Sequence, residues 1–457
     1  MYKIISNLKN IFYLQVFEFL SNFNKKKRIF YSLQKTKKKK NGKLNSEIKS
    51  IFENNREHPL AYYEFANSYL NSDPLSTFNK LEKFSLIQKN WEKKQKNQGE
   101  RYLPLQQVLG SIGNYLTVYY YLLYYYNIDK EYNKPTLLIK ENEKINNKVI
   151  FDLFSPHLNI IKDSFKFFRD RDLIETFQIP LKIGMPFKSK YYPWFAGINY
   201  INQELESKEK IVFEKLFLNE KQITQGEIIL EKLGIKKDDW FVTLHVREGI
   251  GNNYTNSDPK TYLPAVNEIV SRGGKVVRVG DRKMTKLPKI KGLIDYPFTE
   301  HKSELMDLFL AQNSRFCIGT SSGYWTFLTF LGKPILLTNY LPTLDYFLLR
   351  KQDMFLPKKL IKKSNGQVLS FNEIFKYPNA YIDTDEQLKK YEIIDNSEEE
   401  ILNSVKDMIN KIENKTSIEF KNLNKNFKNN VSQINEFSNG KLKCFADLSE
   451  KYLENNH

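Results

Sequence analysis

Between residues 231 and 340, short apolar runs alternate with stretches of helical length, and this alternation constrains the fold more than any other feature. The apolar runs are FVTLHV (241–246), KVVRVG (275–280), GLIDY (292–296), RFCIG (315–319) and PILLT (334–338). The stretches of helical character lie at 259–272, 302–313 and 322–332. Strands that alternate with helices of about 10–15 residues are typical of a parallel, doubly wound sheet. We therefore predict an open α/β sheet for this region.

The remaining segments differ from this region in composition and pattern. At 457 residues the chain exceeds the length at which one hydrophobic core usually stops growing, so two core domains are expected. The predicted segments are a basic arm at 1–45, a helical leader at 46–100, a first βα domain at 101–230, the doubly wound domain at 231–385 and a polar helical tail at 386–457. The tail either packs back on the first domain or projects into solvent.

The first βα domain carries two apolar runs and a pair of glycines. PTLLIK (135–140) and KVIFD (148–152) have the length and composition of short buried strands. Before them, Gly110 and Gly113 stand at the opening of a long aromatic helix, and Asn114 follows. Glycines at such a place let the amino end of a helix approach a ligand or the partner domain. A tight entry into the helix, without ligand contact, is the alternative.

The first strand of the doubly wound region delivers three reactive side chains to its carboxyl end, namely His245, Arg247 and Glu248. That end of the strands is where open α/β sheets bind their ligands. Arginine grips phosphate through a planar fork of donors. His245 shares the strand face of Arg247 because side chains alternate with a period of two. The alternatives are an ion pair of Arg247 with Glu248 or Asp281, and a purely structural histidine.

Two further loops are expected at the same edge. GTSSGYW leads from a strand into a helix, where free amides suit an anion, and it supplies Gly319, Thr320, Ser321, Ser322 and Gly323. RVGDRKM supplies Arg278, which can reach phosphate, Gly280, and Asp281, which can bind a base or a ribose hydroxyl. Ser321 as a simple helix N-cap is the alternative. Three such loops from one sheet favour a phosphorylated or nucleotide-linked substrate.

A general base is sought among the acids near Arg247. Glu248 adjoins the arginine, and Asp258 lies in the following loop. Asp258 followed by proline is also a favourable start for a helix, which is the alternative. Two Asp-x-Asp pairs, at 170–172 and 383–385, are interpreted as solvated surface acids. With five scattered histidines and two cysteines, we expect neither a metal site nor a bound cofactor.

The first 45 residues carry most of the positive charge. They hold twelve lysines and arginines against one acid, Glu18, which is +11 of the chain's net +18. An aromatic-rich segment at 11–23 precedes the lysine run and is too short and interrupted to span a bilayer. This pairing suits an interfacial helix on an anionic cytoplasmic membrane surface. A core helix followed by a solvated linker is the alternative, and nucleic-acid binding is a third interpretation that the pattern disfavours.

From about Trp240 to Pro357 the chain resembles a family of bacterial glycosyltransferases associated with surface-polysaccharide synthesis. The resemblance rests on an ordered set of motifs: LHVRE (244–248), NSDPKTYLPAV (256–266), RGGKVVRVGD (272–281), LPKIKGLIDY (287–296), MDLFLAQNSRFCIGTSSG (306–323), FLGKPILLTNYLP (330–342) and DMFLPKK (353–359). It implies a GT-B architecture, in which two Rossmann-like domains face each other across a cleft and the second holds most of the sugar nucleotide.

The His-Val-Arg element is also similar to the His-x-Arg of fucosyltransferases that use GDP-fucose. There the arginine neutralises the donor diphosphate, and the resemblance implies this role for Arg247. The loop that follows, GIGNNYTNSD (249–258), departs from the fucosyltransferase pattern. The resemblance therefore leaves the base, the sugar and the nucleotide open.

The resulting interpretation is a metal-independent, inverting glycosyltransferase that moves a sugar from a nucleotide-sugar donor to a surface polysaccharide or a lipid-linked glycan. Arg247 with Glu248 or Asp258 carries the chemistry, the three loops bind the donor, and the segment with Gly110, Gly113 and Asn114 faces the acceptor. We expect a cytoplasmic protein, peripheral on the inner membrane face through residues 1–45, with no nucleic-acid partner. The alternatives are a nucleotide-sugar epimerase of the same fold and a non-catalytic module that binds membrane or nucleic acid.

Overall fold

The computed structural model describes most of the chain. The described residues are 44–68, 84, 86–88, 90–91, 102–103, 112–129, 134–145, 147–164, 185–188, 190–192, 194–213, 216–249, 254–341, 344–375, 388–434 and 442–456. The basic arm up to residue 43, Gly110 and both Asp-x-Asp pairs lie outside them.

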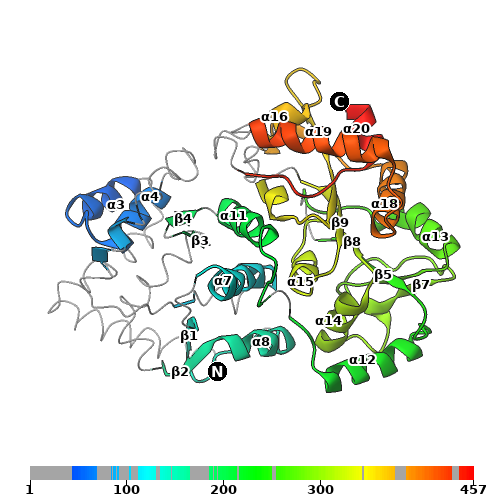
Figure 1. Cartoon of the computed structure of the whole chain (residues 1–457), viewed down its shortest axis with the longest axis horizontal. Coiled ribbons are helices and arrows are strands. Elements are labelled where there is room, and N and C mark those ends of the chain that lie inside the picture. The colour runs from blue at the N-terminus through cyan, green and yellow to red at the C-terminus, as the bar shows by residue number, and fades with distance from the viewer. Residues whose placement is uncertain are drawn as a thin grey trace. The chain divides into compact units, whose positions relative to one another are not determined.

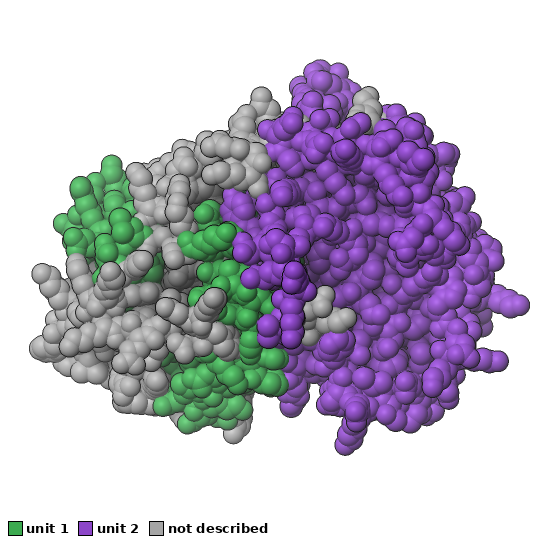
Figure 2. Space-filling model, viewed as in Figure 1, with its two compact units in different colours: residues 1–110, 120–146, 154–197 green, residues 111–119, 147–153, 198–457 purple. Residues whose placement is uncertain are grey.

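The chain forms two compact units that do not follow the sequence contiguously. Unit 1 comprises Met1–Gly110, Tyr120–Asn146 and Phe154–Gly197, and unit 2 comprises Ser111–Tyr119, Asn147–Leu153 and Ile198–His457 (Figure 2). Unit 2 therefore contains the predicted doubly wound domain and tail, together with three segments that the sequence places in the first βα domain: 111–119, 147–153 and 198–230.

Unit 1 combines helices with two small sheets. In its leader, α3 (Leu44–Glu53) packs against α4 (Pro59–Asn67). The strand β1 (Thr136–Ile139) pairs in parallel with β2 (Asn159–Lys162), and β3 (Met185–Phe187) pairs antiparallel with β4 (Lys190–Tyr192). The helices α7 (Tyr115–Asn127) and α11 (Trp194–Glu206) extend from it into unit 2. The prediction of a buried strand at 135–140 is confirmed.

The prediction of a strand at 148–152 is wrong, because this run forms the helix α8 (Lys148–Phe154). The side-chain Oδ1 of Asn147 accepts a hydrogen bond from the amide of Ile150 at 2.9 Å and so satisfies an otherwise free donor at the helix start. A short apolar run fits a strand and a buried helix equally well, and here the capping residue decides between them.

Unit 2 is built on a six-stranded sheet in which every pairing is parallel. Its strands are β5 (Phe241–His245), β6 (Lys275–Arg278), β7 (Leu293–Asp295), β8 (Cys317–Gly319), β9 (Ile335–Tyr340) and β10 (Met354–Pro357), in the order β10-β9-β8-β5-β6-β7. The first strand thus lies in the middle, and the chain winds outward from it in both directions. This is the strand order of a Rossmann-like sheet. The predicted doubly wound α/β fold is confirmed.

Helices cover both faces of this sheet (Figure 1). One group consists of α13 (Leu263–Ser271), which contacts β6, and α18 (Glu398–Ile412), which contacts β9 and β10. The other group consists of α12 (Glu220–Lys232), α14 (Glu304–Asn313) and α15 (Tyr324–Phe330), of which α15 contacts β8 and β9. Because helices cover both faces, most strands are nearly continuous apolar runs instead of alternating ones.

The polar tail packs on the sheet of unit 2, and this differs from both outcomes that the sequence allowed. It contains β12 (Tyr391–Ile394), which pairs antiparallel with β11 (Lys359–Lys362), and then α18, α19 (Ile418–Ile434) and α20 (Glu450–Asn456). The reason lies in α18, whose buried residues recur at helical spacing: Ile401, Val405, Met408 and Ile409. Among the described residues, no helix is both long and apolar enough to cross a membrane.

Candidate functional site

The strands β5 and β8 are neighbours in the sheet, and the chain leaves them toward opposite edges. His245 at the end of β5 is in register with Gly319 at the end of β8. In an open α/β sheet, such a switch point opens a crevice outside the carboxyl ends of the strands, where ligands bind. The two loops that the sequence singled out, after His245 and after Gly319, therefore flank the switch point.

Arg247 stands two residues beyond the end of β5 and is held by its backbone. Its amide donates to Oγ1 of Thr320 at 2.9 Å, and its carbonyl accepts from the amide of Ser257 at 3.1 Å. Its side chain is partly buried, and its guanidinium makes no ion pair or hydrogen bond with any residue that the structure describes. A partly buried charge without a protein partner is costly unless an anion meets it.

The loop after β8 offers hydrogen-bond donors beside Arg247. Thr320 is fully buried, and its amide donates to the carbonyl of His245 at 3.1 Å. The amides of Ser321, Ser322 and Gly323 donate to no acceptor among the described residues. The helix that follows, α15, has only seven residues, so the donors that this loop could offer to an anion are these amides and not a helix macrodipole.

His245 is a neutral ring packed into this loop. Its Nδ1 lies 3.1 Å from Oγ of Ser322, and its ring stacks on that of Tyr324 with centroids 5.3 Å apart and an interplanar angle of 10°. Burial lowers the pKa of His245 to about 4, and the nearby charges of Arg278, Arg247 and Lys302 act in the same direction. The ring is therefore uncharged at neutral pH and can orient or hydrogen-bond a ligand without adding charge.

Arg278 was predicted to reach a phosphate, but the structure places its side chain among carboxylates of the protein. The side chain is fully buried and forms ion pairs with Glu248 and with Asp295, the latter at 3.1 Å. It also donates to the carbonyl of Thr285 at 2.5 Å. The cause is the register of the sheet, because β7 brings Asp295 directly beside Arg278 at the end of β6. The guanidinium is thus neutralised by carboxylates inside the protein and is not free to bind a phosphate.

Each of the three acids that the sequence proposed already accepts at least one hydrogen bond from the protein. Glu248 accepts from Arg278 with one oxygen and from the amide of Thr285, at 2.9 Å, with the other. Asp258 caps a 3₁₀ turn through the amide of Lys260 at 2.9 Å, which is the alternative that its sequence context predicted.

The third acid, Asp281, is exposed and accepts from the amide of Lys283 at 2.8 Å. Gly280, immediately before it, has φ +144°, and a Cβ there would lie 2.1 Å from Sδ of Met284. The glycine is therefore required for the tight turn after β6.

The predicted acceptor segment lies against the loop after β8. Gly113 and Asn114 belong to a 3₁₀ turn, η1 (Ile112–Asn114), at the start of α7. A Cβ added to Gly323 would lie 3.1 Å from the amide nitrogen of Gly113, so the two glycines permit a close backbone approach within unit 2. The carbonyl of Asn114 accepts from the hydroxyl of Thr117 at 2.6 Å. This places the second glycine of the predicted pair beside the candidate site.

Sequence reasoning missed several charged or aromatic groups at this edge. Tyr324 follows Gly323 directly and supports His245, but an aromatic residue at a helix start gives no signal of that role. Lys302, which lies just before α14, forms an ion pair with Asp307 in the first turn of α14. Burial raises the pKa of Asp307. Within the described ranges, no group of three or more His, Cys, Asp or Glu residues could hold a metal ion.

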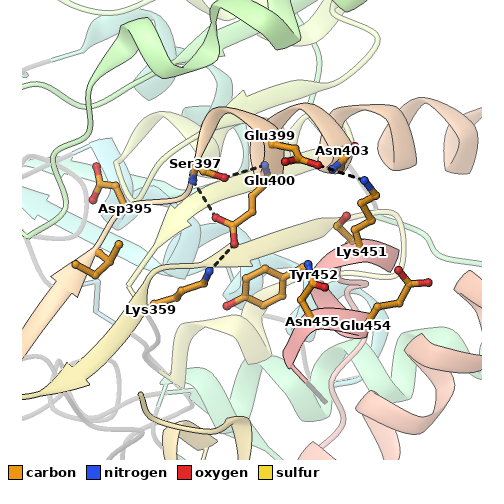
Figure 3. Close-up of a pocket in the computed structure, with 12 residues that line it drawn as sticks. Lys359, Asp395, Ser397, Glu399, Glu400, Asn403, Lys451, Tyr452, Glu454 and Asn455 are labelled. Atoms are coloured by element: carbon orange, nitrogen blue, oxygen red, sulfur yellow. Dashed lines mark hydrogen bonds and ion pairs between the residues drawn. The ribbon is translucent and has the colours of Figure 1, made fainter. Parts of the chain in front are cut away.

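A separate pocket of about 400 Å³ lies on the tail side of unit 2. Polar residues of β11, α18 and α20 line it, including the ion pairs Lys359–Glu400 and Lys451–Glu399 (Figure 3). None of its lining residues belongs to the loops after β5 or β8. Its lysines are already neutralised by carboxylates, so it is not a second anion site.

No protein-family model matches this sequence, and no curated protein sequence matches it. Solved glycosyltransferases resemble parts of its structure. A family 9 glycosyl transferase from Veillonella parvula matches at 10% identity and a TM-score of 0.34, covering 57% of this chain and 86% of that chain. The ADP-heptose LPS heptosyltransferase II of E. coli matches at 11% identity and a TM-score of 0.29, covering 52% and 82%.

The dodecameric, iron-containing heptosyltransferase TibC, in complex with ADP-D-beta-D-heptose, matches at 12% identity and a TM-score of 0.33, covering 68% of this chain and 75% of that chain. Sequence identity and structural overlap are low in all three.

Proposed function

We propose that this chain is a glycosyltransferase of the GT-B type. It would transfer a sugar from a nucleotide-sugar donor to a cell-surface polysaccharide or a lipid-linked glycan. The observation that carries the proposal is the guanidinium of Arg247, which has no protein partner among the described residues and stands at the switch point of a Rossmann-like sheet. Beside it, the loop after β8 has three backbone amides that donate to no acceptor among the described residues.

This arrangement suits the diphosphate of a nucleotide sugar. The planar fork of Arg247 can bind two phosphate oxygens, and the amides of Ser321 to Gly323 can donate to the others. The Nε2 atom of His245 has no partner among the described residues, since only Nδ1 contacts Ser322. The neutral imidazole can therefore accept from or donate to the donor substrate according to its tautomer.

In the proposed reaction, an acceptor hydroxyl oxygen forms a bond to the anomeric carbon while the bond from that carbon to the diphosphate oxygen breaks. Negative charge grows on the leaving diphosphate, where Arg247 and the loop amides are already oriented to stabilise it. Attack from the face opposite the leaving group inverts the anomeric configuration. The guanidinium of Arg247 would take the place of a metal ion, so the proposed reaction is metal-independent.

The acceptor hydroxyl must lose its proton to a base. Of the two predicted carboxylates, Glu248 is neutralised by buried Arg278. Asp258 fits the role better, because it is exposed and only its Oδ1 accepts a hydrogen bond within the described part of the chain. We retain Asp258 as the proposed base. The basic arm would bring the enzyme to a lipid-linked acceptor at the inner membrane face.

A thermal-shift screen of ADP, GDP, UDP, dTDP and CMP and their sugar conjugates tests the proposal. A ligand that binds only the folded state stabilises it by about 2.7 kcal/mol at 100 times its dissociation constant. We expect one nucleotide series to raise the melting temperature by several degrees. A flat response to every nucleotide and nucleotide sugar would contradict the proposed function. Conversion of the bound sugar nucleotide to an epimer without any acceptor would favour the epimerase instead.

A further inference from the structure

The tail contributes two polar residues that lead toward the candidate site. Asp395 and Asn396 lie between β12 and α18, more than a hundred residues after Arg247 in the sequence. Each begins a series of hydrogen bonds through buried groups, and the two series end at the loops after β5 and β8. Figure 3 shows Asp395 apart from the neighbouring pair of Lys359 and Glu400.

The first series passes through Lys358. The side chain of this lysine is 3% exposed, and its Nζ donates to Oδ1 of Asp395 at 2.6 Å and to the carbonyl of Asn256 at 2.8 Å. The next residue, Ser257, donates its amide to the carbonyl of Arg247 at 3.1 Å. Lys358 therefore holds the backbone at Asn256 and Ser257, and Ser257 in turn hydrogen-bonds to Arg247.

The second series passes through Asn339 and Tyr262. Asn339 and Asn396 exchange two hydrogen bonds of 2.6 Å, each from a backbone amide to the other's Oδ1. Nδ2 of Asn339 donates to the hydroxyl of Tyr262 at 3.0 Å, and this hydroxyl lies 2.7 Å from Oγ1 of Thr338. Thr338 donates to the carbonyl of Gly319 at 3.2 Å, one residue before Thr320.

These groups are nearly inaccessible to water, with Tyr262, Thr338 and Asn339 at 0% and Asn396 at 2% exposure. Removing one partner from such a network leaves the others unsatisfied, which costs more than the bond itself contributes. Asn339 also has φ +48°, in the left-handed region that asparagine tolerates better than most residues. Apolar packing alone would hold the tail in place, whereas directional bonds also fix where the two loops lie.

We infer that Lys358, Asp395 and Asn396 are positioning residues for the donor site, so that the tail completes the site without touching the ligand. This inference rests on the proposed function. Its geometric basis is that the two series converge on Arg247, through its carbonyl from Ser257 and through its amide from Thr320. Loss of either series would loosen the loop that holds the guanidinium.

Lys358→Met tests the inference, and Lys359→Met is the matched control, since the adjacent Lys359 pairs with Glu400 away from both loops. The probe is the nucleoside 5′-diphosphate with the largest thermal shift in the screen. We expect Lys358→Met to weaken its binding roughly tenfold and Lys359→Met to change it by less than about twofold. Amide hydrogen exchange at Arg247 and Ser257, measured without ligand, should accelerate in Lys358→Met and stay unchanged in Lys359→Met.

Asp395→Asn serves as a milder second variant, because the amide oxygen of the asparagine can still accept from Nζ of Lys358 while the negative charge is lost. It should weaken binding in the same direction and by a smaller factor. Normal binding with unchanged exchange in both variants would overturn the inference while the proposed function stands. If the wild-type protein binds no nucleoside diphosphate, the proposed function fails, and the inference of a donor site fails with it. The exchange measurement needs no ligand, so unchanged exchange in Lys358→Met would refute the positioning role by itself.

Discussion

Arg247→Ala is expected to abolish most nucleotide-sugar binding while the protein stays folded. The guanidinium has no partner among the described residues, so its removal leaves no protein group unpaired. The diphosphate, by contrast, loses its charged donor. Truncation of one member of a desolvated charge pair costs about 2–5 kcal/mol, which corresponds to a loss of roughly 30-fold to several thousand-fold in affinity. Isothermal titration with the nucleotide identified by the screen measures this loss.

Two variants control for charge and for general damage. Arg247→Lys keeps the positive charge and loses the planar fork, so an intermediate affinity is expected. Arg272→Ala removes an arginine that pairs with Glu268 at the opposite, amino end of the strands, and it should bind as the wild type does. If Arg247→Ala binds the nucleotide as tightly as the wild type, Arg247 does not contact the diphosphate and the proposed site is wrong.

Arg278→Met is expected to destabilise the protein strongly. The substitution fills a similar volume but leaves the carboxylates of Glu248 and Asp295 without their cation. Breaking a buried ion pair from one side costs about 3–5 kcal/mol. The midpoint of denaturant unfolding should fall accordingly, and adding Glu248→Gln and Asp295→Asn in the same chain should restore much of the loss.

The matched control is Arg272→Met, whose ion pair with Glu268 is 34% exposed at the arginine. An exposed pair contributes only about 0–1 kcal/mol, so a small change in stability is expected there. If Arg278→Met instead keeps wild-type stability and loses nucleotide binding, Arg278 contacts the ligand as the sequence first indicated. That result would contradict the structural role given to it here.

The parallel sheet was predictable because its signal is local. Each strand of unit 2 from β5 to β9 is a short apolar run, and helical stretches separate consecutive strands except β6 and β7. The placement of His245 and Gly319 at strand ends follows from these strand boundaries alone. The strand β10 was not predicted, since its four residues end in proline and are followed by two lysines. The tail did carry a usable signal, because the buried positions of α18 recur at helical spacing.

The partners of charged side chains were not predictable from spacing. Arg278 meets Glu248 and Asp295 from positions 30 and 17 residues away, and only the strand register brings the three together. Lys358 lies 102 residues from Asn256, so nothing in its local sequence distinguishes it from the exposed lysines nearby. Whether an arginine faces a ligand or a carboxylate is decided by tertiary contacts, and the sequence could only propose both.

The most direct test of the central claim is a crystal structure of the protein with the bound nucleoside diphosphate. We predict that the diphosphate lies outside the ends of β5 and β8, within hydrogen-bond distance of the Arg247 guanidinium and of the amides from Ser321 to Gly323. A diphosphate bound elsewhere, with Arg247 paired to a carboxylate of the protein, would contradict the account.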